Sequence, residues 1–135
     1  MNIWFFRFKF EQQLAVTLQK YLNLYQDSNI VFATQQNPLY HEGFRMKRYM
    51  NDGTEHHGYH ADSCQGNNKR ILAVLFYLNS VDVGGETSFL NQGVVVAPVA
   101  GRLVMFPTSF SFVHAGRRPL SNAKYVVIDF LTVEV

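Results

Sequence analysis

The chain has 135 residues, of which 47% are hydrophobic and 15% aromatic, so it can bury a core and does not have the composition of a disordered protein. Its formal net charge of +2 is too small to indicate nucleic-acid binding. The only cysteine, Cys64, excludes an internal disulfide and favours a reducing compartment. Charged residues interrupt the short apolar start at Arg7 and Lys9, so no signal peptide or membrane span is predicted. We therefore expect a cytoplasmic protein without a membrane partner.

The first third of the chain predicts one helix and two short strands. Apolar residues recur at helical spacing over Phe10–Tyr25, and Asp27-Ser28-Asn29 is typical of a helix end. The pattern then predicts a strand at Ile30–Thr34, a polar loop over Gln35–Gly43 and a strand at Phe44–Met50. We expect the helix to support a sheet formed by the strands that follow.

The rest of the chain is predicted to consist almost entirely of strands. Turn residues separate short runs of apolar and β-branched residues. One helix followed by about eight short strands indicates a mainly β fold, either a β-sandwich or a jelly-roll barrel, in one domain spanning residues 1–135. Residues 1–43 would form the support and residues 44–135 the core. The predicted strands are Arg70–Asn79, Glu86–Leu90, Gly93–Ala97, Arg102–Phe106, Phe110–His114 and Lys124–Val133.

The segment His60-Ala61-Asp62 is a candidate metal-binding motif. In an extended segment, side chains two residues apart point to the same face, so His60 and Asp62 can contact one ion together. An imidazole and a carboxylate are two parts of the facial triad of two histidines and one carboxylate, which suits non-haem Fe(II). His114 ends a predicted strand and can supply the third ligand. Three other histidines remain alternatives for that role, namely His41 and the two that lie in a predicted loop, His56 and His57.

Lys124 lies on the apolar face of a predicted strand, where it alternates with Val126, Ile128 and Phe130. A buried ammonium group without a partner is costly. Lys124 either extends from the start of the strand to water or binds an anion. A ligand with a carboxylate at one end and a metal-chelating group at the other would satisfy both Lys124 and the metal.

These motifs, in this order, resemble those of the Fe(II)/2-oxoglutarate-dependent dioxygenases, and the prolyl 4-hydroxylase-like branch is the nearest match. The resemblance covers roughly Phe44–Val133, and the segment before Phe44 is shorter than is usual in that family. Beside His60-x-Asp62, His114 and Lys124, it rests on Phe76-Tyr77-Leu78-Asn79, Gly84-Gly85-Glu86-Thr87 and Gly101-Arg102-Leu103-Val104-Met105-Phe106.

The resemblance implies a double-stranded β-helix core of the jelly-roll or cupin-like type, with His60, Asp62 and His114 as the iron ligands. It also implies that Lys124 binds the distal carboxylate of 2-oxoglutarate. The resemblance also places Tyr77 near that carboxylate, and an equally supported interpretation is that Tyr77 is a core aromatic residue with a hydrogen-bonded hydroxyl. The additional residues that the resemblance places near the cosubstrate are Tyr77, Tyr49 and Thr87.

The implied reaction is hydroxylation of a C–H bond, with peptidyl proline as the default substrate and succinate and CO2 as products. Fe(II), 2-oxoglutarate and O2 would take part, with ascorbate as an optional reductant. The partner would be a peptide, a protein or a small molecule, and a carboxylate at Asp62 favours hydroxylation over halogenation. Two alternatives stay open, a nucleic-acid oxidative demethylase on the same scaffold and a non-enzymatic metal-binding jelly-roll module. The small net charge argues against the first alternative, and Lys124 argues against the second.

Overall fold

The computed structural model describes residues 3–29, 38–54, 56–63 and 69–134, which divide into the compact units Met1–Pro38 and Leu39–Val135. The first unit contains helix α1 (Ile3–Ser28), which is longer than the predicted helix because the first 37 residues contain no glycine or proline. No helix in the described part of the chain is long and apolar enough to cross a membrane. The supporting role of the helix stays a prediction. The predicted strand at Ile30–Thr34 and the cysteine Cys64 lie outside the described residues.

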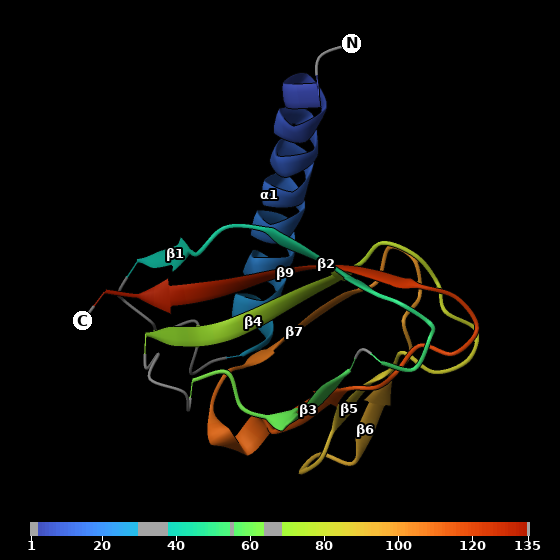
Figure 1. The fold of residues 1–135 in the computed structure, drawn as a ribbon. Coiled ribbons are helices and arrows are strands. Elements are labelled where there is room, and N and C mark those ends of the chain that lie inside the picture. The colour runs from blue at the N-terminus through green and yellow to red at the C-terminus, as the bar shows by residue number, and fades with distance from the viewer. Residues whose placement is uncertain (1–2, 30–37, 55, 64–68, 135) are drawn as a thin grey trace. The chain divides into compact units, whose positions relative to one another are not determined.

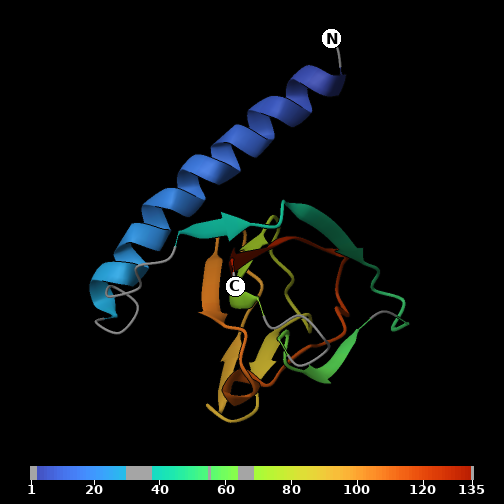
Figure 2. The same ribbon diagram turned by 90° about the vertical axis from the view of Figure 1, so that its left-hand side faces the viewer.

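Nine strands in the described part of the second unit form two antiparallel sheets. Figures 1 and 2 show the arrangement of the strands from two directions. The mainly β prediction is therefore confirmed. The first sheet contains β1 (Leu39–His41), β2 (Arg45–Tyr49), β9 (Lys124–Val133), β4 (Arg70–Tyr77) and β7 (Leu103–Pro107). The second sheet has the order β3 (His57–His60), β8 (His114–Gly116), β5 (Thr87–Phe89) and β6 (Val94–Val96).

Strand β9 lies at the centre of the first sheet and begins and ends at the residues that the sequence predicts. Along one side it pairs with β4, and along the other it pairs first with β2 and then with β1. Its register with β2 places Lys124 opposite Tyr49 and Ile128 opposite Arg45. Since side chains alternate along a strand, Lys124, Ile128 and Phe130 share the face of β9 that lines the cavity described below.

A small aromatic core connects the elements of the two sheets. Its buried members are Ala73 on β4, Phe89 on β5, Phe106 on β7 and Phe130 on β9. Full burial of one such phenylalanine contributes about 1.5–3 kcal/mol, so this cluster is a main source of stability between the sheets. The core therefore holds together the two sheets, whose facing sides carry the polar residues of the site described below.

Three local predictions were wrong. The predicted loop Gln35–Gly43 contains β1, and His57 belongs to strand β3 rather than to a loop. The predicted strand Phe110–His114 begins instead with a 3-10 helix at Phe110–Phe112. A hydrogen bond of 2.9 Å from the Phe112 amide to the Ser109 carbonyl closes this turn, which leads the chain from β7 in the first sheet to β8 in the second. As a result, His114 begins a strand instead of ending one.

Candidate metal and cosubstrate site

The two histidines of the predicted metal motif face each other on neighbouring strands. His60 is the last residue of β3 and His114 is the first residue of β8, and the two are register partners in the antiparallel pair. Their ring centroids are 4.4 Å apart. Cross-strand partners lie within about 5.5 Å of each other, so this pairing overcomes the long separation of the two residues in the sequence.

Backbone carbonyl groups orient both imidazole rings. Nδ1 of His60 donates to the carbonyl of Gly58 at 2.7 Å, and Nδ1 of His114 donates to the carbonyl of Phe112 at 3.0 Å. A carbonyl oxygen can only accept, so in both neutral rings the proton is on Nδ1 and the lone pair is on Nε2. Both rings thus present a metal-binding nitrogen on the side away from the backbone.

Asp62 completes a cluster that can hold a metal ion. Its Oδ1 lies 3.5 Å from Nε2 of His60, and its Oδ2 lies 3.6 Å from Nε2 of His114. One ligand atom from each of the three residues lies within 4.8 Å of the other two. The hydrogen bond with Asp62 raises the pKa of His60, whereas burial lowers the pKa of His114. Two imidazole nitrogens and one carboxylate fit the donor set that non-haem Fe(II) prefers, so the residues present fit this metal.

Aromatic side chains pack around the buried member of this cluster. His114 is 7% exposed, and its ring lies 4.6 Å from the Phe106 ring and 5.7 Å from the Phe89 ring, measured between centroids. These contacts restrict the movement of the imidazole ring. The cluster is therefore held by packing as well as by hydrogen bonds.

The other histidines do not join this cluster. Nδ1 of His41 lies 3.2 Å from Oδ2 of the fully buried Asp129, whose side chain alternates with those that line the cavity. His57 lines the cavity without being part of the metal cluster, and burial lowers its pKa. His56 lines a second, shallower depression that Arg117 also lines.

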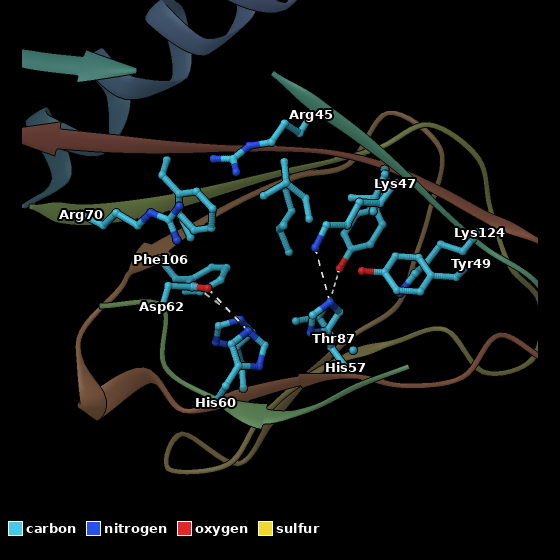
Figure 3. Close-up of a pocket in the computed structure, with 18 residues that line it drawn as sticks. Arg45, Lys47, Tyr49, His57, His60, Asp62, Arg70, Thr87, Phe106 and Lys124 are labelled. Carbon is cyan, nitrogen blue, oxygen red and sulfur yellow. Dashed lines mark hydrogen bonds and ion pairs between the residues drawn. The ribbon is translucent and has the colours of Figure 1, made fainter. Parts of the chain in front are cut away.

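The metal cluster opens into a cavity of about 260 Å³ between the two sheets (Figure 3). His60 and His114 come from the second sheet, and Asp62 follows β3, whereas the opposite wall consists of β2, β4, β7 and β9. All seven residues that the sequence analysis assigned to the site line this cavity. They are Tyr49, His60, Asp62, Tyr77, Thr87, His114 and Lys124.

Lys124 is a buried cation in this cavity. It is 3% exposed, and its Nζ donates to the carbonyl of Gly85 at 3.0 Å and lies 4.5 Å from the centroid of the Tyr49 ring. Within the described residues it forms no ion pair with a carboxylate. Burial lowers its pKa to about 8, and the charge of Glu86 partly opposes this shift. Such a site favours binding of an anion, because a negative group would compensate the Lys124 ammonium for the water that burial removes.

Two hydroxyl groups meet in this cavity from different sheets, that of Tyr77 on β4 and that of Thr87 on β5. The Tyr77 hydroxyl and the Thr87 Oγ1 are 2.5 Å apart, and both residues are buried. Burial raises the pKa of Tyr77, so its hydroxyl stays protonated and can donate. Because a hydroxyl can also accept, the pair can rearrange to place one donor toward a carboxylate in the cavity.

Sequence reasoning missed three cationic residues that line the cavity, Arg45, Lys47 and Arg70. Arg70 forms a two-point contact with Glu42, at 2.5 and 2.7 Å, and its guanidinium lies 3.8 Å from the centroid of the Phe130 ring. Period-two alternation within the predicted strand Phe44–Met50 places Arg45, Lys47 and Tyr49 on one face and could have found the first two.

Comparison with known proteins identifies the family. Residues 44–132 match the family model described as the 2OG-Fe(II) oxygenase superfamily. The chain belongs to this superfamily. It is therefore an oxygenase, and its family implies Fe(II) and 2-oxoglutarate as cofactor and cosubstrate. No functionally curated protein matches the chain by sequence.

Solved structures of prolyl hydroxylases share the fold. A collagen prolyl hydroxylase from Paramecium Bursaria Chlorella virus-1, with 2-oxoglutarate bound, aligns over 93% of this chain and 73% of its own at 17% identity and a TM-score of 0.73. A Trichoplax adhaerens prolyl hydroxylase in complex with a peptide fragment aligns over 84% and 56%, at 22% identity and a TM-score of 0.63. A prolyl 4-hydroxylase from Phytophthora capsici is 27% identical over 67% of this chain and 32% of its own, with a TM-score of 0.58. The double-stranded β-helix prediction is confirmed by this likeness.

Proposed function

We propose that this oxygenase hydroxylates a C–H bond of a peptidyl proline, with His60, Asp62 and His114 as its iron ligands. The observation that carries the proposal is that this cluster and the buried Lys124 line one cavity from opposite walls. A molecule that chelates a metal at one end and carries a carboxylate at the other fits this arrangement. 2-Oxoglutarate is such a molecule.

The three ligands would contribute in different ways. His60 and His114 supply neutral nitrogens whose direction is fixed by the carbonyls of Gly58 and Phe112. Asp62 supplies the single negative charge and occupies a coordination position that a small residue would leave open to a halide. The three protein ligands leave the remaining positions of the metal for the cosubstrate and O2.

Lys124 would bind the distal carboxylate of 2-oxoglutarate. The Tyr49 ring and the Gly85 carbonyl already hold its ammonium group in place, so little side-chain entropy is lost when the anion binds. Tyr77 and Thr87 line the same cavity and would donate one hydroxyl hydrogen bond to that carboxylate. The arrangement would set the distance from the distal carboxylate to the metal end of the cosubstrate.

Bound iron would supply the oxidising chemistry, in which O2 and 2-oxoglutarate yield succinate, CO2 and one oxygen atom for the substrate C–H bond. The role of the chain is to orient the reactants and exclude water. Phe106 and Phe130 form part of the apolar cavity lining, which lowers the access of solvent to the reacting groups. Asp62 would act as a metal ligand and not as an acid or base in this scheme.

Peptidyl proline as the substrate is supported by the named activities of the similar structures, one of which holds a peptide. The small net charge does not favour a nucleic-acid substrate. We place the enzyme in the cytoplasm, where its single cysteine would stay reduced.

The test begins under anaerobic conditions with addition of Fe(II) and then 2-oxoglutarate. We expect the weak visible charge-transfer band of the chelate in the unchanged protein, and no band in Asp62→Ala. With O2, ascorbate as reductant and a panel of proline peptides, we expect succinate release together with a peptide that has gained one oxygen atom. Protein with bound Fe(II) that never forms the band would overturn the proposal.

A further inference from the structure

Strand β2 directs a row of side chains into the cavity from the first sheet. Arg45, Lys47 and Tyr49 alternate along the strand and all line the cavity, whereas Arg48 between them does not, although Arg45, Lys47 and Arg48 are all exposed. Tyr49 lies opposite Lys124 in the sheet, and Lys47 lies opposite Val126. Lys47 is thus placed on the cavity wall next to the predicted cosubstrate site, as Figure 3 shows.

The charge of Lys47 is not neutralised within the described residues. Its Nζ lies 3.4 Å from Nε2 of His57, and no described carboxylate lies within ion-pair distance of it. A neutral imidazole accepts a hydrogen bond but carries no charge. Among the described residues, Lys47 therefore presents an ammonium group at the cavity with a weak neutral acceptor, His57, as its hydrogen-bond partner.

The two arginines of the cavity differ from Lys47 in this respect. Glu42 contacts Arg70 through two hydrogen bonds and also forms an ion pair with Arg45. The Phe130 ring further restricts both arginines, because each guanidinium group lies over this ring. Their charge is already compensated in part, and their geometry is fixed.

When the metal and 2-oxoglutarate are bound in the proposed way, neither of them neutralises the charge of Lys47. In the function proposed above, one carboxylate of 2-oxoglutarate pairs with Lys124 and the other binds the metal, whose charge Asp62 neutralises only in part. No negative group of the cosubstrate then remains for Lys47. A cationic cavity wall attracts and orients an anionic group of the next molecule to enter.

We propose that Lys47 binds a carboxylate of the substrate, so that this hydroxylase selects peptides with an acidic side chain close to the reacting residue. The inference rests on the proposed function and names the substrate class of that same site. His57 would hold the Lys47 ammonium toward the cavity until the carboxylate replaces it. Lys47 is a specificity-determining residue in this scheme and contacts no reacting atom.

The experiment measures peptide binding to protein loaded with Mn(II) and N-oxalylglycine, an unreactive analogue of 2-oxoglutarate. Three fluorescent peptides with amidated ends differ only in the residue beside a central proline, which is Glu, Gln or Lys. We expect the Glu peptide to bind about tenfold more tightly than the Gln peptide, as for a charge-assisted hydrogen bond in a partly enclosed site. A Gln peptide with a free carboxyl end distinguishes a terminal carboxylate from a side chain.

Two substitutions and one control make the result specific. Lys47→Met should remove the preference for Glu, and Lys47→Glu should reverse it in favour of the Lys peptide, a gain that misfolding cannot produce. Arg48→Met removes the same charge from the opposite face of β2 and should leave the ranking unchanged. Binding of N-oxalylglycine should be the same in all four proteins.

The outcomes separate this inference from the function on which it rests. Equal binding of the Glu and Gln peptides, with normal binding of Mn(II) and N-oxalylglycine, overturns the role of Lys47 and leaves the oxygenase site intact. A loss of N-oxalylglycine affinity in Lys47→Met assigns Lys47 to the cosubstrate and overturns the inference as well. Failure of the unchanged protein to bind N-oxalylglycine overturns both proposals.

Discussion

The two walls of the cavity are built on different physical principles. On the second sheet, His60 and His114 have short side chains whose rings are fixed by backbone carbonyls and by packing against aromatic groups. On the first sheet, long cationic side chains reach into the cavity from strands β2 and β9. Lys124 is buried and held from two sides, whereas Lys47 is exposed to the cavity and contacts one imidazole.

This difference predicts how each wall responds to change. A metal site requires its donors within a few tenths of an ångström, so the second sheet offers no substitute for a lost ligand. A charge–charge interaction falls gradually with distance, and the first sheet can tolerate alterations with graded effects. Substitutions should therefore be almost all-or-none on the histidine wall and adjustable on the lysine wall.

The largest expected effect is that of His114→Ala. Loss of a residue that only supports a metal ligand lowers metal affinity by up to about 100-fold. Removal of a nitrogen that binds the metal itself should therefore lower Fe(II) affinity by more than about 100-fold and abolish succinate formation. The measurement is Fe(II) binding by anaerobic titration, together with succinate release. His41→Ala is a matched control, because His41 contacts a buried aspartate outside the metal cluster. Retained turnover in His114→Ala would break the assignment of the triad.

The next effect concerns Lys124 and pH. Only the protonated amine attracts a carboxylate, and burial lowers its pKa to about 8, so 2-oxoglutarate affinity should fall as pH rises through this value. Between pH 7 and pH 9 we expect a decrease of about tenfold, since a protonation-linked affinity changes by a factor of ten per unit above the pKa of the free site. Calorimetric titration of the Mn(II)-loaded protein with 2-oxoglutarate measures it directly.

Two variants test whether Lys124 is the group responsible. Lys124→Arg keeps its charge at every pH used, because arginine does not lose its proton in this range, and should give a flat profile. Lys124→Met should bind 2-oxoglutarate about 100-fold more weakly than the unchanged protein at pH 7, the effect of leaving one buried carboxylate unpaired. A falling profile in Lys124→Arg would show that another group titrates.

The sequence allowed the fold class to be predicted, and the seven residues that it assigned to the site line one cavity, because alternation and motif order are properties of the chain itself. Strand β9 was predicted at its observed residues, and with it the face that Lys124 shares with Val126 and Ile128. The cross-strand pairing of His60 with His114 was not predicted. Its register depends on contacts between segments far apart in the sequence.

The remaining features depend on backbone groups and on local turns that carry no side-chain signal. The Gly85 carbonyl that binds Lys124 has no signature in the sequence beyond a glycine pair, and both glycines have positive φ, 78° at Gly84 and 75° at Gly85. The apolar run Phe110–His114 is equally compatible with a strand, so the 3-10 turn within it could not be predicted. Lys47 was not predicted to line the site, although its alternation with Arg45 and Tyr49 in the predicted strand Phe44–Met50 is visible in the sequence.

The smallest expected effect separates two roles of the hydroxyl pair. Tyr77→Phe should raise the KM for 2-oxoglutarate about fivefold, the effect of one lost hydrogen bond, if the hydroxyl donates to the distal carboxylate. If Tyr77 and Thr87 bind only each other, Thr87→Val should lower the free energy of unfolding by about 1–3 kcal/mol because a buried hydroxyl loses its partner. The double variant should then recover most of that stability with an unchanged KM. Urea unfolding and the KM, measured on the three variants, decide between a cosubstrate contact and a structural pair that joins β4 of one wall to β5 of the other.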